Sequence, residues 1–410
     1  NVSMKLLVQI GCQPLANDVP EASSVLHALC NDVSMTVTTL DVDRKQLSTT
    51  RIFAEPDRPL VDGEVRVSVE HFALTSNNIT YGVFGDGMRY WDFFPALQDT
   101  ENQDVASLWG RIPVWGFAEV VESRMPAVEV GRRIYGYLPM STDLIVKPGR
   151  VDERGFVDTS EHRSAMAATY NRYMFTDHDP TYRADREAQQ MVLWPLFMTS
   201  FMIDDFLGQN VLEDDASSIA TVVISSASSK TAIGAAYLLA RRAGVTVIGL
   251  TSAKNADFVR SLDCYHRVVT YDQMGDLPSG TASDITAYVD IAGDRSVTHS
   301  VHAHFQDDLS YSMVVGSTHW DAPTATGGGL AGPKPEFLFA PSQIALRSKE
   351  WGREGLDQRV GESWNRFSEW TGSWMKVEQT AGAVAVETLY QELLAGRVDP
   401  TVGHVCSMRS

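Results

Sequence analysis

The stretch from Ala220 onward constrains the fold most, because strand-like and helix-like runs alternate along it. Thr221–Ser225 is rich in β-branched residues, as expected for a parallel strand buried on both faces. Thr231–Ala243 is expected to form a helix that ends at Gly244. The same alternation continues with strands at Val245–Leu250, Arg267–Thr270, Ile285–Ile291 and Tyr311–Gly316, and helices at Ala256–Leu262 and Val297–Phe305. This pattern predicts a doubly wound α/β domain with a parallel sheet.

The N-terminal half has a different sequence pattern. Short β-like runs separated by glycine turns predict a small barrel-like domain; they are Glu64–Val69, Ala118–Glu122 and Arg133–Leu138. Residues 151–190 are polar and show no clear period, so we expect an excursion or lid-like insertion there, followed by an apolar helix at Met191–Leu207. A helix at Glu387–Gly396 and a strand at Thr401–Ser407 predict that the C-terminus rejoins the first domain.

Composition narrows the class of protein and its partners. The 410 residues are 44% apolar and 21% charged, which indicates a globular chain long enough for two domains. A net charge of −18 argues against nucleic acid and anionic membranes as partners. Apolar stretches such as Met191–Met202 are shorter than the roughly 20 residues of a membrane span. The opening Lys5–Ile10 run is short for a signal peptide, and four scattered cysteines fit reduced thiols, so we expect a cytoplasmic protein.

The turn after the first strand of the α/β domain is the first candidate site. It runs Ser225-Ser-Ala-Ser-Ser-Lys-Thr-Ala-Ile-Gly234. In dinucleotide-binding domains, this turn and the following helix N-terminus present backbone N–H groups to the pyrophosphate. We therefore predict that Ser228, Ser229, Lys230 and Thr231 bind a cofactor phosphate. The alternative is a plain helix start, with Ser228 or Ser229 as the N-cap.

Several segments in order resemble the medium-chain dehydrogenase/reductase superfamily, as a divergent member of its zinc-independent, quinone-reductase-like branch. They are Asp62–Val69, Ala73–Thr80, Val114–Glu122, Val128–Tyr137 and Ala240–Leu262. The resemblance implies a Rossmann doubly wound parallel sheet plus a GroES-like β-barrel-type catalytic domain. We assign the Rossmann domain to residues 216–345. The catalytic domain takes 33–215 and 346–410, with the insertion near 151–190.

The resemblance also implies NADP(H) as cofactor, although the glycine-rich family turn is replaced here by Ser229–Ala232. After the second strand the chain reads Leu250-Thr-Ser-Ala-Lys254, without the carboxylate that NAD enzymes use to bind the ribose. Ser252 and Lys254 match positions that bind the 2′-phosphate in NADPH-using relatives, although a helix cap followed by a solvated lysine would look the same. Three further cofactor-binding candidates are Tyr271, Gly316 and His319.

A zinc site is not expected. Asn77 stands where zinc-dependent relatives carry a cysteine, and Phe117 where they carry a histidine. His299, His302 and His304 lie on a predicted helix of the Rossmann unit, where surface or packing roles are favoured over a metal site.

Without a metal, hydrogen bonds must polarise the substrate while the cofactor supplies hydride. We nominate Tyr81, Asn77 and Tyr90 as catalytic residues, with the aromatic run near Tyr90 as a pocket wall or as core. The leading interpretation is an NADPH-dependent reductase of an enone, quinone or carbonyl small molecule. A lyase or hydrolase on the same scaffold, or a non-catalytic NADPH-binding protein, are the alternatives. The resemblance further implies a homodimer.

Overall fold

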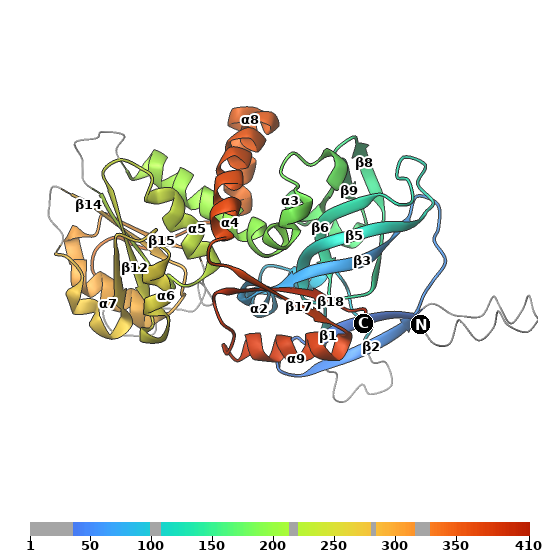
Figure 1. The fold of residues 1–410 in the computed structure, drawn as a ribbon, viewed down its shortest axis with the longest axis horizontal. Coiled ribbons are helices and arrows are strands. Elements are labelled where there is room, and N and C mark those ends of the chain that lie inside the picture. The colour runs from blue at the N-terminus through green and yellow to red at the C-terminus, as the bar shows by residue number, and fades with distance from the viewer. Residues whose placement is uncertain (1–35, 99–107, 213–219, 280–283, 316–328) are drawn as a thin grey trace, which may run out of the picture.

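The computed structural model describes residues 36–98, 108–212, 220–279, 284–315 and 329–410. Two α/β bodies lie side by side: a parallel-sheet domain, and a domain built on a mixed sheet that contains both chain ends of the described region (Figure 1). The molecule thus combines a Rossmann domain with a GroES-like β domain, the fold class expected from the sequence.

The Rossmann domain is a six-stranded parallel sheet. Its strands are β11 (Ala220–Ile224), β12 (Val245–Thr251), β13 (Arg267–Thr270), β14 (Ile285–Asp290), β15 (Tyr311–Val314) and β16 (Glu336–Phe337). They pair in the order β13-β12-β11-β14-β15-β16. Numbered within the domain this is 3-2-1-4-5-6, the order of dinucleotide-binding sheets, whose ligands bind where the order reverses, between β11 and β14.

The expected segments of this domain are present, with shifted ends. The first helix, α5 (Lys230–Leu239), ends before the expected Ala243, and Gly244 has a φ of 75° in the turn that leads to β12. Helices α6 (Ala256–Ser261) and α7 (Arg295–Phe305) follow β12 and precede β15. His302 on α7 is buried, and its ring nitrogens lie 2.7 Å from the Ala331 carbonyl and 2.9 Å from the Ser312 hydroxyl, so it is a satisfied packing histidine.

The second domain is built on a mixed sheet. Its path is β17 (Lys376–Ala381), β18 (Val402–Ser407), β3 (Val65–Leu74), β5 (Pro113–Ser123), β6 (Arg133–Pro139), β10 (Arg172–Phe175), β9 (Gly155–Asp158) and β8 (Pro148–Asp152). A short strand, β7 (Asp143–Val146), also pairs with β3, and β1 (Thr36–Asp43), β2 (Thr50–Pro56) and β4 (Trp109–Gly110) form a smaller sheet. Because β18 pairs with β3, the C-terminal strand rejoins the first domain, as expected.

The segment 151–190 is more regular than a lid-like excursion. It supplies β9 and β10 to the main sheet and the short helix α3 (Ala168–Asn171) beside it. Arg163, only 1% exposed, fixes this segment, because its guanidinium donates to Asp158, to the Asn171 side chain and to the Tyr173 hydroxyl at 2.9–3.0 Å. The insertion is therefore part of the barrel domain and carries α3 to the domain junction.

Two long helices join the domains (Figure 1). Helix α4 (Glu187–Asn210) contains Pro195 and packs on α5 and on α8 (Ala340–Thr371), which the sequence analysis did not predict. By length and composition α4 passes as a membrane span, but most of that segment is buried within this structure, as in the core helix of a folded domain. In the contact between α4 and α8, the rings of Trp194 and Trp364 pack edge to face, and the ring of Phe197 stacks on that of Phe367. The expected boundary at residue 345 falls inside α8, so the domain limits stay an interpretation.

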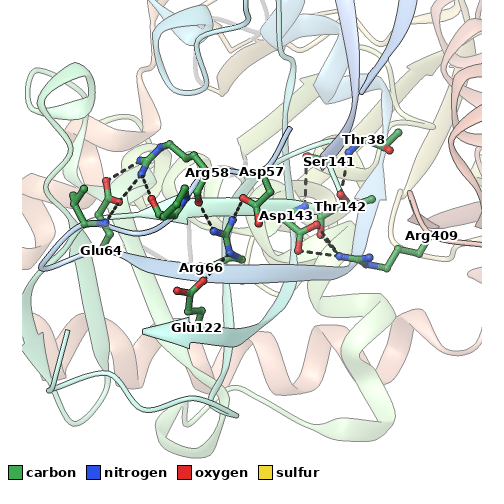
Figure 2. A network of polar contacts seen from close by, with 12 residues as sticks. Thr38, Asp57, Arg58, Glu64, Arg66, Glu122, Ser141, Thr142, Asp143 and Arg409 are labelled. Atoms are coloured by element: carbon green, nitrogen blue, oxygen red, sulfur yellow. Dashed lines mark hydrogen bonds and ion pairs between the residues drawn. The ribbon is translucent and has the colours of Figure 1, made fainter. Parts of the chain in front are cut away.

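A polar network on the barrel domain fastens the chain ends (Figure 2). Arg409, two residues after β18, donates to both carboxylate oxygens of Asp143 in β7 and to the Ser68 hydroxyl in β3. Buried Arg66 of β3 binds the carboxylates of Asp57 and Glu122. The Arg409 contacts anchor the segment after β18 to β7 and β3, whereas the Arg66 contacts tie β3 to β5 and to the segment that follows β2.

Candidate functional site

A cleft of about 480 Å³ lies between the two domains, at the carboxyl edge of the Rossmann sheet. Residues that follow four of its parallel strands line it: Ser226 after β11, Ile291 after β14, Val315 after β15 and Leu338 after β16. The opposite wall comes from the barrel domain, with α2 (Ser76–Val83), α3, α4 and the start of β18. The cleft therefore lies where sheets of this order bind their ligands.

The turn between β11 and α5 contains a left-handed residue although it has no glycine before Gly234. Ser226 has a φ of 54°, in the left-handed region that glycine favours, and its N–H donates to the Tyr271 hydroxyl at 2.9 Å. Ser225 is buried, donates to Asp290 at 2.9 Å, and accepts from the N–H groups of Ile291 and Ala292. Side-chain hydrogen bonds thus hold a backbone path that glycine would otherwise make easy.

Helix α5 starts at this turn with donors facing the cleft. Ser229 is the N-cap, and its hydroxyl accepts from the Ala232 N–H at 3.3 Å, in agreement with the plain-cap alternative. The N–H groups of Ser228, Lys230 and Thr231 have no acceptor within the described part of the chain. All four residues from Ser228 to Thr231 line the cleft. Unsatisfied N–H groups and the positive end of the helix dipole favour an anion at this position.

Lys230 places its ammonium at the domain junction. Nζ donates to the carbonyl oxygens of Val402 at 2.9 Å and Pro400 at 3.3 Å, on the segment that leads into β18. Burial lowers the pKa of this amine to about 8, against an opposing effect of Asp399. An ammonium has three donors, so two carbonyls leave one N–H for a ligand in the cleft. Lys230 thus ties the domains together and retains one donor for binding.

Ser252 and Lys254 follow β12, the strand next to β11 in the Rossmann sheet. Ser252 is half-buried and precedes the short turn η5 (Ala253–Asn255), and Lys254 is exposed. Neither lines the cleft itself, but the next residue, Asn255, does, and its amide donates to the Ser228 hydroxyl at 3.0 Å. The predicted 2′-phosphate position is therefore connected to the phosphate turn through one hydrogen bond.

The other predicted cofactor residues have different outcomes. Tyr271 does not line the cleft; it supports the turn through Ser226, and burial raises the pKa of its hydroxyl. Gly316 and His319 lie outside the described residues.

Aromatic side chains form the barrel wall of the cleft. Tyr81 and Tyr90 both line it, with ring centroids 4.6 Å apart, and Trp115 of β5 and Tyr170 of α3 complete the wall. The Trp115 indole N–H lies 3.5 Å from the Tyr81 hydroxyl. Burial raises the pKa of Tyr81, and neighbouring Tyr90 adds to the effect, so this hydroxyl keeps its proton at neutral pH.

The two neighbouring asparagines of α2 have different positions. Asn77, the predicted catalytic residue, is half-buried and lines the cleft near Tyr81. Asn78 is buried and points into the fold, where its amide donates to the Pro113 carbonyl at 2.8 Å and its side-chain oxygen accepts from the Thr75 N–H. Asn78 therefore fixes the start of α2 and orients the neighbours that face the cleft.

Among the cleft residues that the sequence analysis did not nominate, Tyr170 and His404 carry polar groups on the barrel side. Tyr170 comes from the insertion, whose sequence shows no period that would place it near Tyr90. His404 lies in β18, lines the cleft and is 8% exposed. A lone imidazole in the otherwise apolar run Val402-Gly-His-Val-Cys406 was an available signal. Within the described ranges, no group of three His, Cys, Asp or Glu side chains could hold a metal ion.

Comparison with known proteins identifies the family. Residues 72–399 match the family described as protein of unknown function DUF2855. The chain belongs to the DUF2855 family. A search of curated protein sequences found no match.

Solved structures resemble this DUF2855 chain in fold. CurA from Vibrio vulnificus in complex with NADPH has a TM-score of 0.56 at 12% identity, over 91% of this chain and 99% of that one. A mutant enoyl thioester reductase from Candida tropicalis has a TM-score of 0.52 at 12% identity, over 91% of this chain and 100% of that one. A probable oxidoreductase from Mycobacterium abscessus has a TM-score of 0.50 at 11% identity, over 91% of this chain and 99% of that one. The expected medium-chain dehydrogenase/reductase fold is confirmed at this level.

Proposed function

We propose that this protein is an NADPH-dependent reductase of a small enone, quinone or carbonyl compound that transfers hydride without zinc. One observation carries the proposal: a single cleft has a Rossmann phosphate turn on one side and a wall of tyrosines on the other. Dinucleotides bind at that edge of a 3-2-1-4-5-6 sheet, and an apolar wall with a few hydroxyls suits a small carbonyl substrate. The similar structure of CurA, described as an NADPH complex, supports the choice of cofactor.

The residues present fit such a cofactor. The N–H groups of Ser228, Lys230 and Thr231, which lack other acceptors in the described chain, would hold the pyrophosphate. Ser252 and exposed Lys254 would bind the 2′-phosphate, with no carboxylate in the Leu250–Lys254 segment to repel it. NADPH, when bound, supplies the hydride.

Tyr81 would stabilise the substrate oxygen on which negative charge develops. Because burial raises its pKa, the phenol acts as a hydrogen-bond donor rather than as a base. Asn77 and Tyr90 lie beside it on the same wall and would orient the substrate. In a Tyr81→Phe variant the ring packing is retained, so we expect turnover to fall about 10²–10³-fold, the usual effect of losing one such donor. Unchanged turnover in the folded variant would exclude this role.

A screen of NADPH oxidation over enones, quinones and aldehydes, preceded by a binding titration, tests the proposal. Saturable NADPH binding with oxidation by at least one substrate class is the expected result. Binding without oxidation of any substrate would favour a non-catalytic NADPH-binding protein. Turnover of a substrate without NADPH binding would favour a lyase or hydrolase. The homodimeric state and the cytoplasmic location stay predictions from sequence.

A further inference from the structure

The barrel side of the cleft presents aromatic rings that a ligand can reach. Tyr170 of α3 and Trp115 of β5 are half-buried, and both line the cleft. Their ring centroids lie 6.1 Å apart, and the Tyr170 ring also meets the Tyr90 ring edge to face at 6.0 Å. The Tyr90 ring in turn lies 4.6 Å from that of Tyr81. These four rings form one continuous surface, the aromatic wall.

The aromatic wall has uncharged neighbours. The other cleft residues from α2, α4 and the segments beside them carry no formal charge; they include Asn77, Thr80, Phe84, Met88, Trp194 and Met198.

Lys230 and Asp399 are the charged residues among the described ones that line the cleft, and His404 is neutral because burial lowers its pKa. The Lys230 ammonium already binds the Val402 and Pro400 carbonyls and, in the proposed function, a cofactor phosphate. An anionic substrate would therefore meet no spare cation from the described lining, and Asp399 would repel it. Burying an unpaired charge is costly, so this cleft favours an uncharged substrate.

Tyr170 is the part of the aromatic wall that comes from the insertion, and a buried cation fixes its position. The Arg163 guanidinium donates to the Tyr170 carbonyl at 2.7 Å, and the Tyr170 N–H donates to the Ala167 carbonyl at 3.0 Å. The ring packs 4.9 Å from that of Tyr137 and meets that of Phe93 edge to face at 5.4 Å, and both of these residues are buried. A ring held in this way loses little freedom when a ligand packs on it.

We propose that the substrate is an uncharged, flat conjugated molecule whose ring packs on the aromatic wall, and that Tyr170 is a specificity-determining residue. Aromatic rings pair favourably with other flat π systems, in offset or edge-to-face geometry, beyond the effect of buried area. A saturated ring of the same size offers only apolar surface. This inference rests on the proposed function, and it narrows the substrate to enones, quinones or carbonyl compounds that contain a flat ring.

Three enones with the same reacting group test the substrate class. 4-Phenyl-3-buten-2-one carries a flat ring, 4-cyclohexyl-3-buten-2-one a saturated ring with the same number of carbon atoms, and 4-(4-carboxyphenyl)-3-buten-2-one a carboxylate on the flat ring. Their dissociation constants are measured by calorimetry on the complex with NADP⁺, which has no hydride to transfer, so differences in reactivity do not enter.

We expect the phenyl enone to bind wild-type protein about 2- to 13-fold more tightly than the cyclohexyl enone, the range of one aromatic pair. Burial of apolar area alone predicts the opposite order, because the cyclohexyl ring has the larger apolar surface. The carboxylate should weaken binding at least about tenfold relative to the phenyl enone, because no cation is left to pair with it.

Two variants test Tyr170. Tyr170→Leu removes the ring and keeps apolar surface, whereas Tyr170→Phe keeps the ring and loses only the hydroxyl. We expect Tyr170→Leu to lower the preference for the phenyl over the cyclohexyl enone by at least about twofold, and Tyr170→Phe to retain it. A merely structural role of Tyr170 would weaken both enones alike and leave their ratio unchanged.

The outcomes separate this inference from the proposed function. Equal or tighter binding of the cyclohexyl enone, no loss on adding the carboxylate, or no binding of any of the three enones overturns the substrate class, and the NADPH-oxidation screen then decides the proposed function by itself. An unchanged ratio in folded Tyr170→Leu overturns the role of Tyr170. Wild-type protein that binds neither NADP⁺ nor NADPH overturns both proposals. Circular dichroism of each variant checks that the fold is retained.

Discussion

The charge of Lys230 leads to a specific prediction about NADPH binding, because this amine loses its proton between pH 7 and 9. The amine lies at the α5 N-terminus and binds the carbonyl oxygens of Val402 and Pro400, and burial lowers its pKa to about 8. The groups that face it are Asp399 and His404; burial holds the pKa of His404 below its ordinary value, so it is already neutral at pH 7. Between pH 7 and 9, Lys230 is therefore the group whose titration should alter phosphate binding.

The sign and size of the effect follow from that pKa. As the pH rises through 8 the ammonium loses its proton, and a neutral amine no longer attracts phosphate. If only the charged amine binds phosphate, the fraction of protein with a charged Lys230 falls from about nine tenths at pH 7 to about one tenth at pH 9. NADPH affinity should therefore fall by up to about tenfold. One decade of affinity corresponds to about 1.4 kcal/mol.

Isothermal titration calorimetry of NADPH at the two pH values measures this effect. Lys230→Met should bind weakly at both pH values and lose the pH dependence, since no charge remains to titrate. Lys254→Ala, which removes a different lysine outside the cleft lining, should keep the slope of the wild-type protein and is the matched control. Equal affinity of wild-type protein at pH 7 and 9 would refute the phosphate contact and leave Lys230 as a tie between the domains.

Three further changes have defined outcomes. Lys254→Ala should weaken NADPH by about 1.5–3 kcal/mol and leave NADH nearly unaffected, because only NADPH offers the 2′-phosphate; equal weakening in fluorescence titrations would contradict the assignment. EDTA should leave NADPH oxidation intact, since Asn77 and Phe117 stand where zinc-dependent members of the resembled dehydrogenase superfamily carry metal ligands, and zinc-restorable loss of activity would reverse that conclusion. Arg163→Met should destabilise the fold by about 3–5 kcal/mol in chemical denaturation, because it leaves Asp158 buried without its cation; a change within experimental error would show that the insertion is held by other contacts.

The Rossmann domain could be predicted from sequence because its central strands are short, mostly buried runs rich in β-branched residues. Ala220–Ile224 and Val245–Thr251 are such runs, and each is followed by a helix at the usual spacing. Helix α8 was missed because its first half is polar and Gly352 interrupts it with a φ of 71°. Its second half did carry a helical signal, since Leu356, Val360 and Trp364 recur every four residues.

The candidate site was predictable only on its Rossmann side. The phosphate turn follows a strand directly, so local sequence places Ser228 to Thr231 at the sheet edge. The barrel wall is assembled from segments distant in sequence: Tyr81 on α2, Tyr170 in the insertion and His404 on the last strand. Their proximity depends on strand pairing along the path β18-β3-β5-β6-β10, which no local pattern specifies.

Energy transfer from the cleft tryptophans to NADPH tests the central claim most directly. Trp115 and Trp194 line the cleft, and tryptophan emission overlaps the absorption of the reduced nicotinamide. We expect NADPH to quench wild-type emission saturably, at one cofactor per chain, and a Trp115→Phe/Trp194→Phe variant to bind with similar affinity and to lose only the part of the quenching that these two of the nine tryptophans contribute. Absence of saturable quenching in the wild-type protein would contradict a dinucleotide site between the two domains.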